Sequence, residues 1–150
     1  MKRTDIARTL AAAAFDIGAI KINADNPFTW ASGWKSPMYN DNRLLLKFPV
    51  YRNLVIQGLQ LLIEEQVPNV RTIAGTSTAG IPWASMVADR MGLPCCYIRD
   101  KPKSHGLGNR IEGIDAEEGF SGIEALLIED LISTGGSSVD AVQAIRDAGG

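Results

Sequence analysis

Apolar residues recur at helical spacing in four parts of the chain, and short apolar runs separate these parts. The spacing predicts helices over residues 5–17, 49–67, 81–91 and 139–148. The runs at 70–75, 94–99 and 123–128 predict buried strands, because each is bounded by proline, glycine or small polar residues. Alternating strands and helices are typical of a mostly parallel sheet covered by helices on both faces, so we expect an α/β fold.

Residues 19–43 follow a different pattern. Short β-like pieces alternate with asparagine, proline and glycine, and the segment is too polar for a core and too aromatic for a linker. Aromatic rings beside amides and an arginine suit a flat polar heterocycle, and the candidate contacts are Tyr39, Asn40 and Arg43. An ordinary β-turn subdomain with solvated polar groups is the alternative.

Two of the predicted strands run into loops of small residues, and each loop runs into a predicted helix. The first loop, residues 76–80, reads Thr-Ser-Thr-Ala-Gly, and the second, residues 131–137, reads Leu-Ile-Ser-Thr-Gly-Gly-Ser. Ligands of α/β sheets bind beyond the carboxyl ends of strands, and a helix N-terminus offers free N–H groups to an anion. We therefore expect the two loops to meet at one site for a ligand with two phosphate groups.

Two adjacent carboxylates, Glu129 and Asp130, precede the 131–137 loop. Bare carboxylates repel phosphate, so they suit a ligand that carries hydroxyl groups or a metal beside its phosphate. A sugar phosphate meets that requirement. The lysine of a Walker loop and the Gly-x-Gly-x-x-Gly of a dinucleotide fingerprint are both missing from this stretch.

Composition narrows the class of protein further. The 150 residues are 45% hydrophobic and 21% charged, which is ordinary for one globular domain. The net charge of −2 gives no reason to expect nucleic acid as a partner. No apolar run approaches the roughly 20 residues of a membrane span and no secretory cleavage signal is evident, so we expect a cytoplasmic protein without a membrane partner. The neighbouring Cys95 and Cys96 lack metal-ligand spacing and are interpreted as packing residues in a reducing compartment.

Residues 100–121, together with Arg99, form a glycine-rich, weakly apolar segment. Its first part carries the cations Arg99, Lys101, Lys103 and Arg110. A mobile flap that closes a basic tip over a polyanion is one interpretation, and a solvated hairpin is the other. His105 is the single histidine, and this disfavours both a Ser-His-Asp triad and a metal site built from several histidines.

Residues 128–137, Ile-Glu-Asp-Leu-Ile-Ser-Thr-Gly-Gly-Ser, resemble the phosphoribosyl pyrophosphate signature of the type I phosphoribosyltransferases. Segments 28–43, 74–82 and 99–113 resemble the orotate-using branch of that family, in family order. The resemblance implies the type I phosphoribosyltransferase fold, as a single domain with a small hood at about 19–43 and a flexible catalytic loop at about 100–121. Family members continue beyond the equivalent of residue 150, so we expect a chain that lacks the C-terminal part.

The resemblance implies transfer of ribose 5-phosphate from phosphoribosyl pyrophosphate to orotate, in pyrimidine synthesis, giving orotidine 5′-monophosphate and pyrophosphate. It implies Mg²⁺ held mainly through phosphoribosyl pyrophosphate, and a homodimer whose active sites are shared across the interface. The alternatives are a phosphoribosyltransferase for another base, a non-catalytic phosphoribosyl pyrophosphate-binding regulator, and a plain phosphate-binding domain of flavodoxin type.

The implied roles fall on residues that match the family's motifs. The implied catalytic residues are Lys103, His105, Glu129 and Asp130. Phosphoribosyl pyrophosphate is bound by the acid pair at its ribose hydroxyls, by Leu131, Ile132, Ser133, Thr134, Gly135, Gly136 and Ser137 at its 5′-phosphate, and by Thr76, Ser77, Thr78, Ala79 and Gly80 at its pyrophosphate. Arg99, Lys103 and His105 grip pyrophosphate from the partner subunit, and Ser133 touches orotate beside Tyr39, Asn40 and Arg43.

Three positions depart from the pattern of some family members. Ala31 and Ala79 stand where those members have a lysine, and Asp100 stands where they have a basic residue. We expect Lys101 to replace the missing charge of the flap.

Overall fold

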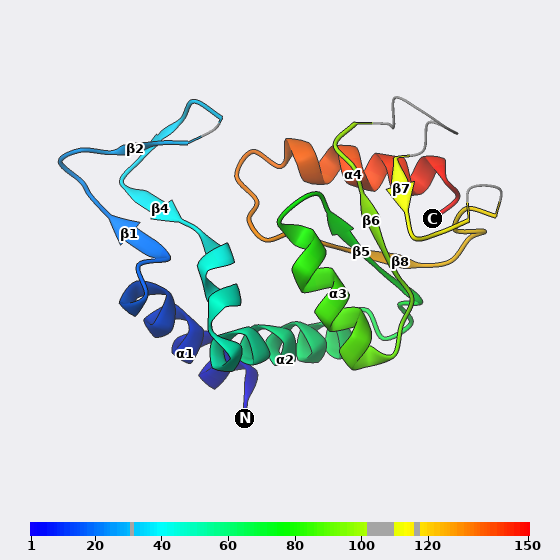
Figure 1. Ribbon diagram of the computed structural model, residues 1–150, viewed down its shortest axis with the longest axis horizontal. Coiled ribbons are helices and arrows are strands. Elements are labelled where there is room, and N and C mark those ends of the chain that lie inside the picture. The colour runs from blue at the N-terminus through cyan, green and yellow to red at the C-terminus, as the bar shows by residue number, and fades with distance from the viewer. Residues whose placement is uncertain (31, 102–109, 116–117) are drawn as a thin grey trace. The chain divides into compact units, whose positions relative to one another are not determined.

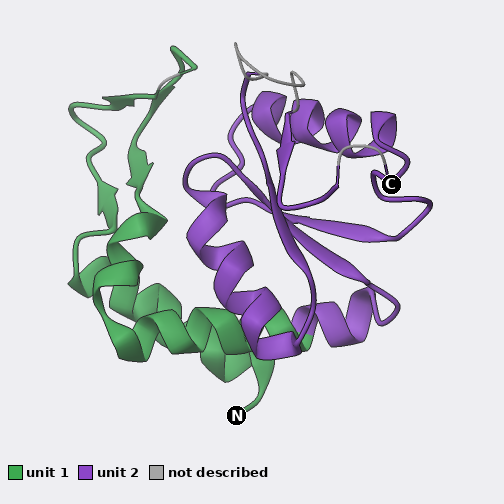
Figure 2. Cartoon of the chain, turned by 45° about the vertical axis from the view of Figure 1, so that its right-hand side comes forward, with its two compact units in different colours: residues 1–61 green, residues 62–150 purple. Residues whose placement is uncertain are grey.

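The computed structural model describes residues 1–30, 32–101, 110–115 and 118–150. Most of the first part of the expected flap, including Lys103 and His105, lies outside the described residues, as does Ala31. The chain divides into two compact units, Met1–Leu61 and Leu62–Gly150 (Figure 2). The expected single domain with a hood at 19–43 stays a prediction.

The first unit combines helices with two small antiparallel hairpins. Its elements are α1 (Arg3–Asp16), β1 (Ile20–Ile22), β2 (Phe28–Thr29), β3 (Lys35–Ser36), β4 (Met38–Asn40), the 3₁₀ helix η1 (Asn42–Lys47) and most of α2 (Pro49–Gln66). β1 pairs with β4, and β2 pairs with β3. Ile6, Ala13 and Ala14 form the buried stripe of α1. A Cβ atom at Gly58 of α2 would lie 3.2 Å from Ile6 Cγ2, so a glycine here permits close helix packing.

The second unit is an α/β layer structure (Figure 1). Its elements are β5 (Thr72–Thr76), α3 (Gly80–Met91), β6 (Cys95–Ile98), β7 (Ile111–Glu112), β8 (Ala125–Ile128) and α4 (Gly136–Asp147). The sheet has the order β7-β6-β5-β8, in which β6, β5 and β8 are parallel and β7 is antiparallel to β6. The prediction of a mostly parallel sheet is confirmed.

Helices cover both faces of this sheet, as predicted. Ala74 of β5 belongs to a buried cluster with Phe120 and with Ala141, Ala144 and Ile145 of α4. The next residue, Gly75, faces the other way, because a Cβ atom there would lie 2.9 Å from Ala84 Cβ of α3. All five residues of β5, including the threonines at its two ends, are buried, as is usual for a parallel strand covered on both faces.

The structure differs from the predicted elements at three places. Helix α4 begins at Gly136, three residues before the predicted start at Val139, because the left-handed conformation of Gly135 (φ 82°) leads the chain into a first turn built of small residues. The short elements η1 and β7 were not expected. Asp41 supports η1 by accepting a hydrogen bond from the Arg43 N–H, and β7 is only a two-residue extension of the sheet.

None of the described helices is both long and apolar enough to cross a membrane.

Candidate active site

The two small-residue loops leave the same edge of the sheet. β5 and β8 are parallel neighbours with Gly75 opposite Ile128, so the 76–80 and 131–137 loops both begin at the carboxyl ends of adjacent strands. This is the edge at which open α/β sheets bind ligands. The expected juxtaposition of the loops is therefore found within one unit of the molecule.

Glu129 and Asp130 follow β8 directly and are both half-buried. The Thr76 hydroxyl, at the end of β5, donates a hydrogen bond of 2.6 Å to Glu129 Oε1. The backbone N–H of Asp130 donates to the same oxygen at 3.2 Å. The structure thus joins the acid pair to the first residue of the 76–80 loop.

The 76–80 loop is bound to both neighbouring strands. The backbone N–H and the hydroxyl of Ser77 both donate to Ile98 O of β6, each at 2.8 Å. The Ser77–Thr78 peptide bond is cis. Thr78 is exposed, Ala79 is half-buried, and Gly80 is buried as the first residue of α3. The loop therefore holds its backbone in place through Ser77 while Thr78 remains open to a ligand.

The 131–137 loop ends in the uncapped N-terminus of α4. No side chain forms a cap hydrogen bond at Gly135, and Leu131, Ile132, Ser133 and Thr134 are exposed. The first N–H groups of a helix have no partners within the helix, and they carry positive partial charge. This N-terminus, reached through Gly135, Gly136 and Ser137, has the chemistry of a phosphate-binding turn.

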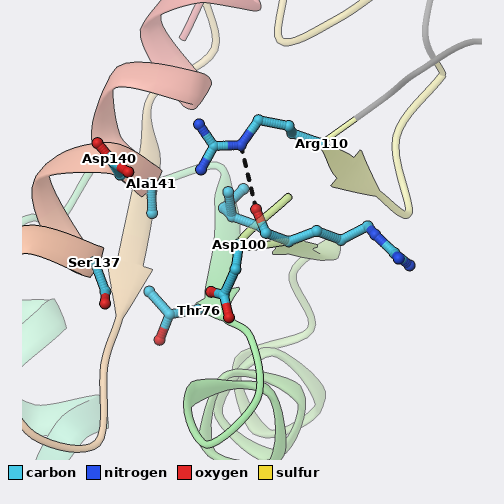
Figure 3. Close-up of a pocket in the computed structure, with 8 residues that line it drawn as sticks. Thr76, Asp100, Arg110, Ser137, Asp140 and Ala141 are labelled. Atoms are coloured by element: carbon cyan, nitrogen blue, oxygen red, sulfur yellow. Dashed lines mark hydrogen bonds between the residues drawn. The ribbon is translucent and has the colours of Figure 1, made fainter. Parts of the chain in front are cut away.

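A pocket of about 120 Å³ lies beside these loops, on the side of the sheet covered by α4 (Figure 3). It is lined by Thr76, Ile98, Arg99, Asp100, Arg110, Ser137, Asp140 and Ala141. Arg110 Nε donates to Arg99 O at 3.2 Å, and Figure 3 shows the Arg110 guanidinium directed toward α4. Two arginines and two aspartates therefore line a pocket that the ends of β5 and β6 share with the first turns of α4.

Arg99 follows β6 and lines this pocket. Its Nη1 lies 3.6 Å from Glu112 Oε1, and its Nε donates to Lys101 O at 3.4 Å. The side chain keeps 39% of its surface exposed, so its charge is only partly engaged. Asp100 and Lys101 are exposed.

The expected base contacts Tyr39, Asn40 and Arg43 belong to the first unit. The Tyr39 ring packs 5.6 Å from Phe28, centroid to centroid. Arg43 forms two side-chain hydrogen bonds to Asp41, at 2.6 and 3.0 Å, and these lower the pKa of Asp41 below its ordinary value. Asn40 Oδ1 is buried and accepts no hydrogen bond in the described part of the chain.

Arg110 and Asp140 line the pocket but are absent from the residues expected to form the site. Arg110 was expected only as one charge of the flap. The pairing of Arg99 with Arg110, where the Arg99 N–H donates to Arg110 O at 2.8 Å, brings it to the sheet edge. The signal for Asp140 was its position one helical turn after Gly136.

Comparison with known proteins gives relatives over nearly the whole chain. The chain is 51% identical, over 142 residues, to a protein of Bacillus cytotoxicus named orotate phosphoribosyltransferase; the match covers 95% of this chain and 66% of that relative. The chain thus spans about two thirds of the relative's length. No family model matches the chain.

Solved structures agree with this result. Orotate phosphoribosyltransferase from Aeropyrum pernix superposes with a TM-score of 0.69 at 26% identity, covering 93% of this chain and 75% of that one. UMP synthase from Leishmania donovani superposes with a TM-score of 0.73 at 30% identity, covering 94% of this chain and 28% of that one. The type I phosphoribosyltransferase fold expected from the sequence is confirmed, and the chain belongs to the orotate phosphoribosyltransferase family.

Proposed function

We propose that the chain transfers ribose 5-phosphate from phosphoribosyl pyrophosphate to orotate, giving orotidine 5′-monophosphate and pyrophosphate for pyrimidine synthesis. One observation carries the proposal: the acid pair and an uncapped helix N-terminus stand together at the edge where the 76–80 loop also begins. A sugar phosphate with a second anionic group has the matching chemistry. The relatives are named for this activity.

The charges are placed to favour the transition state. Breaking the anomeric bond builds positive charge on the ribose ring and negative charge on the departing pyrophosphate. Glu129 and Asp130 stabilise the sugar cation and accept hydrogen bonds from ribose hydroxyls, while the α4 N-terminus with residues 131–137 binds the 5′-phosphate. Interactions that strengthen as charge develops raise the rate, rather than only the affinity.

Cations act at the other end of the breaking bond. Residues 76–80 bind the pyrophosphate, and Arg99 and the flap residues Lys103 and His105 approach it from the partner subunit. Closure of the flap excludes water from the oxocarbenium-like centre. The flap residues lie outside the described part of the chain, and their roles rest on the family resemblance.

Orotate is held by Ser133, Tyr39, Asn40 and Arg43. An aromatic ring stacks on a flat heterocycle, and amide and guanidinium groups bond its edge. Asn40 Oδ1 lacks a partner in the described chain but is buried, so it accepts a bond from a ring N–H only after the side chain turns outward. Arg43 meets orotate only after exchanging, or sharing, its bonds to Asp41.

Mg²⁺ is the proposed cofactor, and the donor set fits it. Mg²⁺ prefers oxygen ligands and is commonly held by one or two carboxylates plus substrate phosphates. We propose that the ion is held mainly through the oxygens of phosphoribosyl pyrophosphate, beside the Glu129 and Asp130 carboxylates that bind the ribose hydroxyls. When bound, the ion neutralises charge on the pyrophosphate leaving group. We further propose a cytoplasmic homodimer with shared active sites.

Loss of orotate absorbance tests the function directly. The chain is mixed with Mg²⁺, phosphoribosyl pyrophosphate and orotate, and parallel reactions with adenine or uracil are followed through pyrophosphate release. Turnover is expected with orotate but not with adenine or uracil. The matched control is the double variant Glu129→Gln, Asp130→Asn, which keeps the shape of the site and removes its charge. Turnover with another base would reassign the substrate. Tight phosphoribosyl pyrophosphate binding without any turnover would instead indicate a regulator.

A further inference from the structure

We propose that Thr76 is a positioning residue, whose hydroxyl fixes the Glu129 carboxylate so that Oε2 faces the ribose. The inference rests on the proposed function, since it assigns the ribose to the acid pair. It adds that the two carboxylate oxygens of Glu129 have different roles: Oε1 accepts hydrogen bonds from the protein, and Oε2 binds the ligand.

In the described part of the chain, the hydrogen bonds to the Glu129 carboxylate all fall on one oxygen. Thr76 Oγ1 donates to Oε1 at 2.6 Å, a length typical of charge-assisted O–H···O⁻ bonds. The Asp130 N–H donates to Oε1 at 3.2 Å. Within the described chain no donor reaches Oε2. The side chain is therefore held from one side, and its second oxygen is the one that remains for a ligand.

The surroundings of Thr76 offer its hydroxyl few hydrogen-bond acceptors. Thr76 is 3% exposed. A Cβ atom at Gly80 would lie 2.5 Å from both Thr76 Oγ1 and Ile128 O, so the start of α3 closes over the hydroxyl. Among the described residues, the other acceptor of this hydroxyl is Ile128 O, which is 3.5 Å away, at the limit of a hydrogen bond. The Thr76 hydroxyl therefore donates its hydrogen bond to Glu129.

Holding Glu129 in advance is useful for this reaction. A glutamate side chain has several rotatable bonds, and an unrestrained one loses entropy when a ligand orders it. A carboxylate already aimed at the developing sugar cation stabilises the transition state without reorganisation. We expect Thr76 to affect kcat most, and ground-state binding of phosphoribosyl pyrophosphate to a smaller but measurable extent.

Two substitutions separate the hydroxyl from the packing. Thr76→Val keeps the shape and removes the donor, whereas Thr76→Ser keeps the donor and removes a methyl group. We expect kcat/KM to fall about tenfold or more in Thr76→Val, mostly through kcat, and to stay within about threefold of the unmodified chain in Thr76→Ser. A packing role predicts the reverse order, with serine the worse replacement.

Thr72→Val is the matched control. Thr72 lies on the same strand and the same face, four residues before Thr76, and is 5% exposed. The chemical change is identical, but Thr72 lies at the start of β5, at the opposite end of the strand from the acid pair. We expect kcat/KM of Thr72→Val within about twofold of the unmodified chain, and thermal midpoints measured in parallel show whether each variant is folded.

A double-mutant cycle with Glu129→Ala makes the inference falsifiable. If Thr76 acts through Glu129, Thr76→Val has no further effect once Glu129 is alanine. An equal effect in both backgrounds, or a serine variant worse than valine, overturns the proposal.

The cycle also has a readout that does not need turnover. If the unmodified chain shows no orotate turnover, the proposed function fails, and calorimetric binding of phosphoribosyl pyrophosphate takes over as the measurement. The positioning role is then upheld if Thr76→Val binds more weakly than Thr76→Ser, and if this difference disappears once Glu129 is alanine. Equal binding by both variants, or no binding by the unmodified chain, rejects it.

Discussion

Cys95 and Cys96 are neighbours in β6, yet their thiols have different surroundings. Cys95 is exposed and Cys96 is buried. Burial, with a smaller contribution from Cys95, raises the pKa of Cys96 to about 12, and burial also raises the pKa of Cys95. Since the thiolate is the reactive form, we expect iodoacetamide at pH 8 to modify Cys95 slowly and Cys96 only after unfolding. Peptide mass spectrometry measures both sites, and a denatured sample, in which both react, is the control. Equal rates in the folded chain would contradict this.

Lys103 is the residue for which the family resemblance makes the sharpest kinetic claim. A cation that meets pyrophosphate as the bond breaks contributes mainly to the transition state. We expect Lys103→Ala to lower kcat by about a hundredfold or more while the affinity for phosphoribosyl pyrophosphate changes little. Lys2→Ala removes the same charge from an exposed position before α1 and serves as the control. An unchanged kcat in steady-state assays would remove Lys103 from the mechanism.

Among the elements, α4 depends on Phe120, which falls within the 100–121 segment expected to be flexible but is buried. Phe120 is 1% exposed and packs with Ala141, Ala144 and Ile145 of α4, and its N–H donates to Ala148 O at 2.9 Å. We expect Phe120→Ala to destabilise the chain by about 3–5 kcal/mol, and to weaken phosphate binding at the other end of the helix. Thermal or denaturant unfolding measures the first effect.

A variant on α4 itself controls for the loss of side-chain volume. Val139 is 68% exposed, so Val139→Ala should change the free energy of unfolding by less than about 0.5 kcal/mol. If Phe120→Ala were equally mild, the cluster would not be what holds α4.

The major elements could be predicted because their signals are local. The strand pattern at β5 and the apolar stripe of α1 follow from burial of a strand or of one helix face, and both elements are found. The start of α4 was missed by three residues, because its first turn is held by a left-handed glycine and contains no apolar residue to mark it. The extent of β7 depends on pairing with β6, which a two-residue run does not reveal.

The candidate site could be predicted as a set of residues but not as a geometry. The acid pair and the two small-residue loops stand out in the sequence by residue type. The bond between Thr76 and Glu129 does not, because it joins residues 53 positions apart. The same holds for Arg110, which reaches the pocket through pairing across the flap.

At the scale of the whole molecule, the proposed sharing of active sites predicts complementation. Lys103→Ala and Asp130→Asn remove groups that belong to different subunits of one site. A hybrid of the two inactive chains has one intact site, so an equilibrated equal mixture should recover about a quarter of the unmodified activity. The measurement is turnover of the mixture compared with each variant alone.

The matched control mixes Glu129→Gln with Asp130→Asn, whose changes fall on the same chain's contribution. That mixture should recover no activity. Size-exclusion chromatography with light scattering shows whether a dimer is present, and a dimer that exchanges subunits without recovery of activity would place Lys103 in its own subunit's site.

The Thr76–Glu129 bond also has a consequence for folding. β5 and β8 are adjacent in the sheet, yet α3, β6 and β7 lie between them in the chain. Such non-local pairing forms slowly, and no partly folded chain lacking it has the acid pair in place. On the proposed function, phosphoribosyl pyrophosphate therefore binds the native chain alone. At a hundred times its Kd it adds about 2.7 kcal/mol to the free energy of unfolding, so the substrate itself protects the enzyme from denaturation.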